Sequence, residues 1–332
     1  MLRILRIIAF PISLIYAIAV IARNFLYDIR FFKSKSFDTP IVCVGNLSVG
    51  GTGKTPMIEY LVRLLEGYKV AILSRGYKRK SKGFLMADKN SNAQDLGDEP
   101  FQMYNKFPEI TLAVDANRIN GIKNLEKLVQ PQLVLLDDAF QHRKVQPTLS
   151  ILLTTFGKLY KDDWYLPTGD LRDSKREAKR ANLIVVTKCP DDLSEENKER
   201  ITKKLSPRPN QKVLFSHFSY APSLKSGSGK TLDWNQLLEK KVAVVTGIAN
   251  PEPFIAHLKS KDFQFQHLEY GDHHDFSTRE LERLKAFDMV VTTEKDYVRM
   301  KGKLQNLYYL EVEHEFSKSD ESVLREELWN LL

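Results

Sequence analysis

A glycine-rich segment near the start of the chain holds the residues best suited to bind phosphate. It reads IVCVGNLSVGGTGKTP over residues 41–56. Backbone N–H groups of such a loop can surround phosphate oxygens, while Lys54 reaches the β- and γ-phosphates and the Thr55 hydroxyl ligates Mg²⁺. The residues of this predicted phosphate-binding loop are Ser48, Val49, Gly50, Gly51, Thr52, Gly53, Lys54 and Thr55.

The loop has the sequence context that the P-loop motif requires. An apolar run at 41–44 precedes it, and a helical pattern of apolar residues at Ile58, Leu61 and Leu65 follows it. It departs from GxxxxGKT at its first position, where Ser48 replaces glycine. The context therefore favours a nucleotide-binding loop over a chance run of glycines.

Two aspartates offer a metal site. Asp137 and Asp138 follow the wholly apolar run at 133–136, and ligands of parallel α/β sheets bind at the carboxyl ends of strands. The alternative is a turn with an aspartate cap. Beside a phosphate-binding loop, Mg²⁺ ligation by these carboxylates, directly or through water, is favoured.

Proline at position 190 of the TKCP run, where a guanine-reading TKxD motif has aspartate, favours ATP over GTP.

The elements that must position these residues alternate between short apolar runs and helix-period segments. This pattern predicts an α/β fold, a P-loop NTPase-like doubly wound parallel sheet. The expected strands are 41–44, 70–73, 111–114, 133–136, 149–153 and 183–187.

A second, smaller α/β domain is expected after an extended run and the flexible KSGSGK stretch. Its predicted strands are 242–245, 264–270, 289–292 and 307–312, followed by an amphipathic helix at 319–332. The predicted organisation is a membrane-associated helix at 1–36, the P-loop domain at 37–212, an extended linker at 213–230 and the smaller domain at 231–332.

The N-terminal segment is apolar from Ile7 to Ala22 and bracketed by arginines at 3, 6, 23 and 30. This run is shorter than the roughly 20 residues of a spanning helix. We predict a helix that lies in the cytoplasmic leaflet, with its arginines at anionic head groups. A buried core helix is the alternative. Secretion is not expected, because a nucleotide-binding motif follows in a chain with two cysteines.

The charge balance predicts an anionic partner. The formal net charge is +8, which suits nucleic acid, an acidic lipid surface or a polyphosphate substrate. Charge alone does not choose among these. Neither cysteine occurs in a CxxC or His-rich spacing that would indicate zinc.

Eight motifs in order give the chain a specific resemblance. Beside the phosphate-binding loop they are SRGY at 74–77, GDEP at 97–100, DDAFQHR at 137–143, LPTGDLRD at 166–173, GIANP at 247–251, DHHDF at 272–276 and TEKD at 293–296. The series resembles that of the tetraacyldisaccharide 4'-kinases. The chain departs from the family pattern at Ala139, where glycine is usual, and at Asp173, where glutamate is usual.

The resemblance implies an ATP- and Mg²⁺-dependent kinase of lipid A (lipopolysaccharide) biosynthesis. Its substrate would be an acylated glucosamine disaccharide 1-phosphate, phosphorylated on the 4'-hydroxyl to lipid IV-A at the cytoplasmic face of a Gram-negative inner membrane. It implies no nucleic acid and no protein partner. By motif position, Asp98 resembles the catalytic base and His273 the histidine that supports it. A helix cap is the alternative for Asp98, because Pro100 suits a first helical turn.

Motif positions also single out two arginines. Arg118 and Arg172 are candidates to stabilise the transferring phosphoryl group or to bind the substrate's 1-phosphate. A solvated surface arginine is the alternative for each. Further site candidates of lower rank are Arg75, Glu99, Gln141 and His142.

Two other classes of function remain open on the residues alone. A membrane-bound regulatory ATPase or GTPase would need only the nucleotide site and the N-terminal anchor. A nucleic-acid-binding ATPase would use the basic balance and runs such as YKRKSKG at 77–83, although no recognised nucleic-acid module accompanies them.

Overall fold

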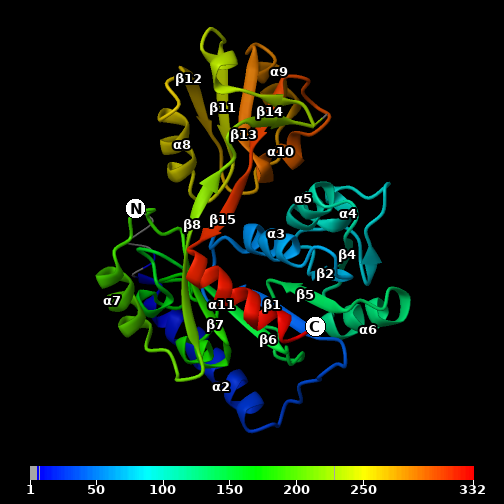
Figure 1. The fold of residues 1–332 in the computed structure, drawn as a ribbon, viewed down its shortest axis with the longest axis vertical. Coiled ribbons are helices and arrows are strands. Elements are labelled where there is room, and N and C mark those ends of the chain that lie inside the picture. Colours follow the sequence, from blue (N-terminus) through cyan, green and yellow to red (C-terminus); the bar gives the residue numbers. More distant parts are fainter. Residues whose placement is uncertain (1–5, 7, 228) are drawn as a thin grey trace.

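The computed structural model describes residues 6, 8–227 and 229–332 of the chain. The remaining part of the predicted N-terminal segment, residues 1–5 and 7, lies outside the described residues. Figure 1 shows two α/β units, one above the other, with strands β8 and β15 running between them. The lower unit contains the predicted phosphate-binding loop, and the upper unit contains the DHHDF and TEKD motifs.

The lower unit is built on a nine-stranded sheet with the order β15-β8-β7-β6-β1-β5-β2-β4-β3. Seven central strands run parallel, and the edge strands β15 and β3 are antiparallel to their neighbours. The strands are β1 (Ile41–Asn46), β2 (Val70–Ser74), β3 (Leu85–Met86), β4 (Thr111–Val114), β5 (Leu133–Asp137), β6 (Leu149–Thr155), β7 (Leu183–Thr187), β8 (Lys212–Tyr220) and β15 (Val312–Phe316). All six predicted strands of this half are confirmed.

Helices cover both faces of this sheet, as the doubly wound prediction requires. One face packs against α3 (Lys54–Leu64), α5 (Asp98–Lys106) and α11 (Lys318–Trp329), and the other against α6 (Arg118–Leu128) and α7 (Glu195–Leu205). A short helix, α4 (Ala93–Leu96), precedes α5. Every residue of β1, β2, β5 and β7 is buried, which explains their continuous apolar runs.

The upper unit has a six-stranded sheet with the order β10-β9-β14-β13-β11-β12. Its strands are β9 (Leu224–Ser226), β10 (Thr231–Leu232), β11 (Val242–Thr246), β12 (Phe265–Glu269), β13 (Met289–Thr293) and β14 (Leu307–Leu310). Its helices are α8 (Glu252–Lys259), α9 (Thr278–Leu284) and α10 (Glu294–Met300). Apolar side chains of α8 pack on one face of this sheet and those of α9 and α10 on the other.

The end of the chain differs from the sequence-based division. The single strand predicted at 307–312 is two strands, because β14 ends at Leu310 in the upper sheet and β15 begins at Val312 in the lower one. Helix α11 then packs Leu324 and Leu328 into the core of the lower unit. Apolar periodicity identifies a strand, but it does not tell which sheet the strand joins.

Helix α2 (Phe10–Asp28) presents apolar side chains to the outside. Ile15 and Ile18 are 70% and 67% exposed, whereas Ser13 and Asn24 are buried against the protein. A buried core helix, the alternative considered from the sequence, is therefore excluded. By length and composition this helix could also cross a membrane.

Candidate active site

The glycine loop connects the end of β1 to α3 and is held by side chains from neighbouring strands. Asn46 Nδ2 donates to Thr52 Oγ1 at 2.8 Å, and Thr187 Oγ1 donates to the Thr52 carbonyl at 2.9 Å. Gly53 caps α3 in the left-handed region with φ of +87°. These contacts fix the backbone where the helix N-terminus opens, the geometry that favours anion binding.

The start of the loop is tied to the LPTGDLRD segment. The Val49 N–H donates to the Asp170 carbonyl at 2.7 Å, and Ser48 Oγ donates at 3.0 Å to Asp163, which lies just before this segment. Arg172, from the same segment, donates to Asn46 at the end of β1. The predicted loop and this distant motif therefore form one structural unit.

Asp137 ends β5 directly beside β1, with Val44 opposite it in the register. Its Oδ2 accepts from Ser74 Oγ at 2.8 Å, whereas its buried Oδ1 has no hydrogen-bond partner among the described residues. Burial, with help from the charges of Glu99 and Asp138, raises the pKa of Asp137 to about 6. An unpartnered buried carboxylate oxygen beside a second carboxylate fits a divalent cation, which would restore the ionised form.

Asp138 brings together the lysine of the glycine loop and an arginine of LPTGDLRD. Lys54 Nζ lies 3.7 Å from Asp138 Oδ1, and the Arg172 guanidinium contacts both oxygens of the same carboxylate. Burial opposes ionisation, but Lys54 and Arg172 hold the pKa of Asp138 well below its usual range. Thr55, next to Lys54, occupies the first turn of α3. Sequence motifs separated by more than 80 residues thus meet at one point.

Arg118 lies behind the aspartate pair and is only 2% exposed. Its guanidinium donates to the carbonyls of Asp115 at 2.6 Å and Asp137 at 3.3 Å. A solvated surface arginine, the alternative from the sequence, is excluded for this residue. In this conformation Arg118 supports the end of β5.

A second group of charged residues surrounds Asp98, the first residue of α5. Arg299 Nε donates to Asp98 Oδ2 at 2.8 Å, and His273 Nδ1 lies 3.4 Å from the same oxygen. Burial alone would raise the pKa of Asp98, but these two contacts lower it to about 2. Gly97 occupies the N-cap position of α5 and Asp98 follows it, with its carboxylate directed to Arg299 and His273, so Asp98 does not serve as the helix cap.

Close packing of two glycine turns sets the position of Asp98. A Cβ at Gly97 would lie 2.8 Å from the Tyr77 carbonyl, and one at Gly76 would lie 2.7 Å from the Leu96 carbonyl. Both glycines have positive φ. The SRGY and GDEP motifs are therefore in direct contact, and the Tyr77 ring packs edge-on against His273 at 5.7 Å.

The sequence reasoning missed two cations of α10. Arg299 joins Asp98 to Asp296 and to the Gly247 carbonyl, and it is 7% exposed. Lys295 Nζ lies 3.1 Å from His273 Nε2 and 3.5 Å from Glu99. Because the charge of Glu99 acts on Asp137, this group adjoins the aspartate pair across the two units. A sequence signal for Arg299 was its position three residues after Asp296, the aspartate of the TEKD motif.

Lys188 is a third missed candidate. It follows β7 with a left-handed φ of +57°, and its Nζ lies 5.5 Å from the Phe218 ring centroid. The same Nζ would be 3.9 Å from a Cβ on Gly51. Within the described ranges no carboxylate pairs with Lys188, and burial lowers its pKa. Such a cation beside the glycine loop suits a phosphate group.

The remaining candidates differ in their surroundings. Gln141 Nε2 donates to the Asn46 carbonyl at 2.7 Å, and His142 is half-buried with its pKa lowered by burial to about 4. Arg75 is exposed. His274 Nε2 lies 3.1 Å from Glu280, away from Asp98, so the adjacent histidines face different partners. No group of three metal-ligating side chains of the His, Cys, Asp and Glu types occurs in the part of the chain that is described.

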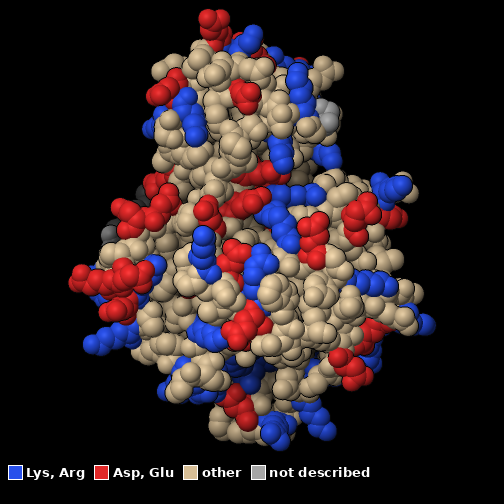
Figure 2. All heavy atoms as spheres, in the orientation of Figure 1, with Lys and Arg blue, Asp and Glu red and all other residues tan. Residues whose placement is uncertain are grey.

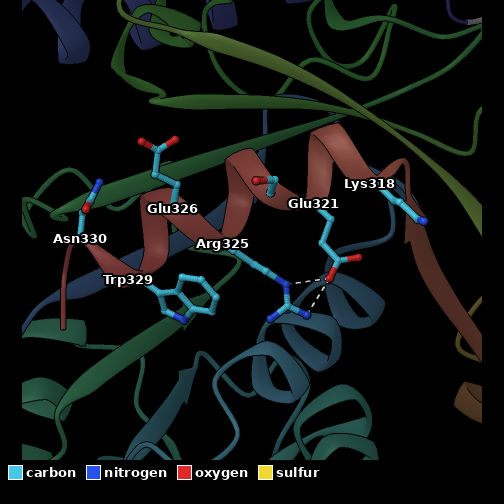
Figure 3. Close-up of a pocket in the computed structure, with 7 residues that line it drawn as sticks. Lys318, Glu321, Arg325, Glu326, Trp329 and Asn330 are labelled. Atoms are coloured by element: carbon cyan, nitrogen blue, oxygen red, sulfur yellow. Dashed lines mark hydrogen bonds and ion pairs between the residues drawn. The ribbon is translucent and has the colours of Figure 1, made fainter.

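Surface hollows and surface charge do not extend the candidate site beyond the residues around Asp138 and Asp98. A hollow of 530 Å³ runs along α11, and Figure 3 shows its lining side chains spread along that one helix with Arg325 paired to Glu321. None of the site candidates lines it. On the face drawn in Figure 2, acidic and basic side chains are interspersed, without the continuous basic stripe typical of nucleic-acid binding.

A glycine loop between a central parallel strand and a helix, with its lysine facing a pair of strand-end aspartates, defines a P-loop nucleotide-binding protein. The model of the tetraacyldisaccharide-1-P 4'-kinase family matches residues 5–332. The chain therefore belongs to the tetraacyldisaccharide-1-P 4'-kinase family, as the motif series indicated.

Individual relatives agree with this assignment. The chain is 49% identical to a tetraacyldisaccharide 4'-kinase of Flavobacterium johnsoniae, over 95% of this chain and 94% of that protein. It is 46% identical to one of Bacteroides thetaiotaomicron, over 88% and 82%. A crystal structure of LpxK from Aquifex aeolicus in complex with ATP has a TM-score of 0.81 and 30% identity, and the match covers 98% of this chain and 99% of that one.

Proposed function

We propose that the chain transfers the γ-phosphoryl group of ATP to the 4'-hydroxyl of a tetraacylated glucosamine disaccharide 1-phosphate. The product would be lipid IV-A, an intermediate of lipid A. The observation that carries this proposal is the position of Asp98, a carboxylate outside the aspartate pair and at the junction of the two units. A kinase with an alcohol acceptor needs such a base, whereas an ATPase activates water.

In the proposed reaction Asp98 accepts the proton of the sugar 4'-hydroxyl as its oxygen attacks the γ-phosphorus. The bond from the γ-phosphorus to the β–γ bridging oxygen breaks, and ADP leaves with that electron pair. His273, 3.4 Å from Asp98, orients the carboxylate. Lys54 and Arg172 supply positive charge beside the loop, where charge spreads over the transferring group.

Thr55, Asp137 and Asp138 are the residues proposed to hold Mg²⁺. The unpartnered Asp137 oxygen supports this donor set. A bound Mg²⁺ would neutralise charge on the phosphates. Arg118 would then act through the Asp137 carbonyl that it holds, as a positioning residue. Residues 48–55 are proposed to surround the phosphates.

We further propose that α2 lies on the cytoplasmic face of the inner membrane. Its outward side chains are apolar, whereas Asn24 Nδ2 donates to Asp173 at 2.6 Å and Tyr16 donates to the Arg172 carbonyl at 3.0 Å. The surface that would contact acyl chains therefore adjoins the segment that carries Arg172. The carboxylate of Asp173, where the family usually has glutamate, accepts hydrogen bonds from Asn24 and Arg23 of the helix.

The direct test is transfer of labelled γ-phosphate from Mg-ATP to tetraacyldisaccharide 1-phosphate in detergent micelles. Wild type, Asp98→Ala and a no-lipid control are compared. We expect lipid-dependent product that is nearly lost in the variant. ATP hydrolysis without lipid and without phosphorylated product would instead support a regulatory ATPase.

A further inference from the structure

His314 lies where the connecting strands pass beside the glycine loop. It is on β15, opposite Phe218 of β8, and these two strands carry the chain between the units (Figure 1). The side chain is buried at 3% exposure, and so is that of Ser216 at 1%. His314 therefore belongs to neither of the charged groups described above, although it contacts the loop directly.

Two hydrogen bonds define the protonation of the ring. His314 Nε2 lies 2.9 Å from the Gly53 carbonyl oxygen, and Nδ1 lies 2.9 Å from Ser216 Oγ. A carbonyl can only accept, so Nε2 carries the proton and Nδ1 accepts from the serine hydroxyl. Burial lowers the pKa of His314 to about 4, which keeps the ring neutral near pH 7.

The bond to Gly53 acts on the first peptide group of α3, whose carbonyl oxygen also accepts from the Met57 N–H at 3.0 Å. The Gly53 carbonyl and the Lys54 N–H belong to one planar trans peptide and point in opposite directions. Holding the carbonyl toward His314 therefore aims the Lys54 N–H the other way, into the helix N-terminus where anions bind. A Cβ at Gly53 would lie 2.9 Å from His314 Nε2 and 3.0 Å from Phe218 Cζ, so the contact also depends on glycine.

We infer that His314 is a positioning residue for nucleotide binding, which orients the Gly53–Lys54 peptide of the phosphate loop from the strand that connects the two units. Ser216 holds the ring through Nδ1, and Phe218 packs edge-on against it at 5.0 Å. The inference rests on the proposed role of residues 48–55 as the phosphate loop. It adds a connection between that loop and the strands that carry the upper unit.

The test compares His314→Leu, which removes the donor, with His314→Gln, whose amide nitrogen can replace Nε2. His217→Gln is the matched control, because His217 lies on the same pair of strands with its side chain paired to Glu315 at the surface. We expect His314→Leu to raise KM for Mg-ATP about tenfold, the effect of one lost buried hydrogen bond, with KM for the lipid unchanged. His314→Gln should recover most of this loss, and His217→Gln should match wild type.

Nucleotide binding is also measured without turnover, as the rise in melting temperature that ATP produces. That rise should shrink in His314→Leu and return in His314→Gln. Ser216→Ala, which keeps the ring but removes the hydrogen bond to Nδ1, should raise KM about threefold, and it decides the question if His314→Leu does not fold. A wild-type KM together with a wild-type rise in melting temperature in His314→Leu would overturn the inference. If His314→Leu does not fold, the same two results in Ser216→Ala would overturn it.

Lys54→Ala in the same series separates this inference from the proposed function. Unchanged ATP binding in Lys54→Ala would overturn the phosphate loop, and with it the role of His314. Weakened binding in Lys54→Ala beside unchanged binding in His314→Leu would overturn the role of His314 alone.

Discussion

As the proposed base, Asp98 would have to be ionised to accept a proton, and its neighbours favour that state strongly. Arg299 and His273 overcome the effect of burial and lower the pKa of Asp98 to about 2. So low a pKa makes the carboxylate a weak base. Movement of Arg299 away from Asp98 would raise that pKa and make the carboxylate a stronger base.

Replacement of Asp98 by asparagine should therefore impair chemistry more than binding. We expect kcat to fall by about 10²–10⁴-fold, the usual contribution of a general base, with KM for ATP within about threefold. Glu109→Gln, an exposed change shortly after α5, is the control. Steady-state kinetics at saturating lipid provide the measurement, and a kcat near that of wild type would exclude Asp98 as the base.

Lys188 gives a second prediction for a single residue. Its ammonium has no carboxylate partner among the described residues and lies beside Gly51. Lys188→Met keeps an unbranched side chain of similar length and removes the charge, so KM for ATP should rise about tenfold through the lost charge-assisted contact. Lys89→Met, an exposed change in the turn before α4, is the comparison. Equal ATP affinity in the two variants would show that Lys188 does not contact phosphate.

Helix α2 reverses the usual arrangement of a surface helix, because its polar side chains face the protein and its apolar ones face outward. Ser13 and Asn24 are buried, while Ile15 and Ile18 are among the most exposed apolar residues of the described chain. Water does not favour this orientation, but an acyl layer does. The proposed membrane contact would therefore give the helix two partners, the LPTGDLRD segment on one side and lipid on the other.

The double substitution Ile15→Asp and Ile18→Asp should release the protein from vesicles. Each buried isoleucine contributes roughly 1.5–3 kcal/mol, so binding to vesicles of zwitterionic and anionic lipids should fall more than about tenfold. Leu128→Asp, an exposed leucine at the end of α6, is the control. Co-sedimentation measures the binding, and the ATP-induced rise in melting temperature should not change. Undiminished sedimentation would remove α2 as the membrane contact.

The sequence predicted elements whose signals are local. The glycine loop, the strand before Asp137 and the apolar N-terminal helix all have short-range patterns, and the structure contains each of them. Pairing partners were not predictable in the same way. Nothing near Val312 shows that β15 returns to the lower sheet, and nothing near Arg299 shows that it meets Asp98, because both depend on contacts between residues far apart in the chain.

At the scale of the whole molecule, a buried cluster of charges joins the two units. Lys106 of α5 contacts Glu59 at 2.8 Å, Glu294 at 3.0 Å and Glu311 at 3.7 Å, and Lys225 contacts Glu311 at 2.6 Å. Three carboxyl groups thus share two lysines. Burial, with the charge of Glu59, raises the pKa of Glu294 to about 8, so this carboxyl carries a proton near neutral pH.

This cluster predicts a dependence of stability on pH. The pKa of Glu294 in the folded protein exceeds its ordinary value of 4.5, so folding binds a proton and becomes less favourable as pH rises from about 4.5 toward 8. Glu294→Gln removes this effect. Relative to wild type, its free energy of unfolding should increase by up to ~1.4 kcal/mol per pH unit across that range. Urea unfolding at pH 5–8 measures this free energy, with Glu313→Gln as control. Parallel pH dependences for wild type and Glu294→Gln would contradict the prediction.

The pairing of β8 with β15 sets the order in which the lower unit can be completed during synthesis. Val312 pairs with Tyr220, so the edge of β8 stays unpaired until the whole upper unit has left the ribosome. At the usual rate of translation this interval lasts roughly 5–20 s. Throughout that time β8 is an open edge strand, the kind of surface that pairs with other chains. Early folding of the upper unit would shorten the time for which the β8 edge is exposed. It pairs β14 with β9, so β15, which follows β14, would emerge beside β8.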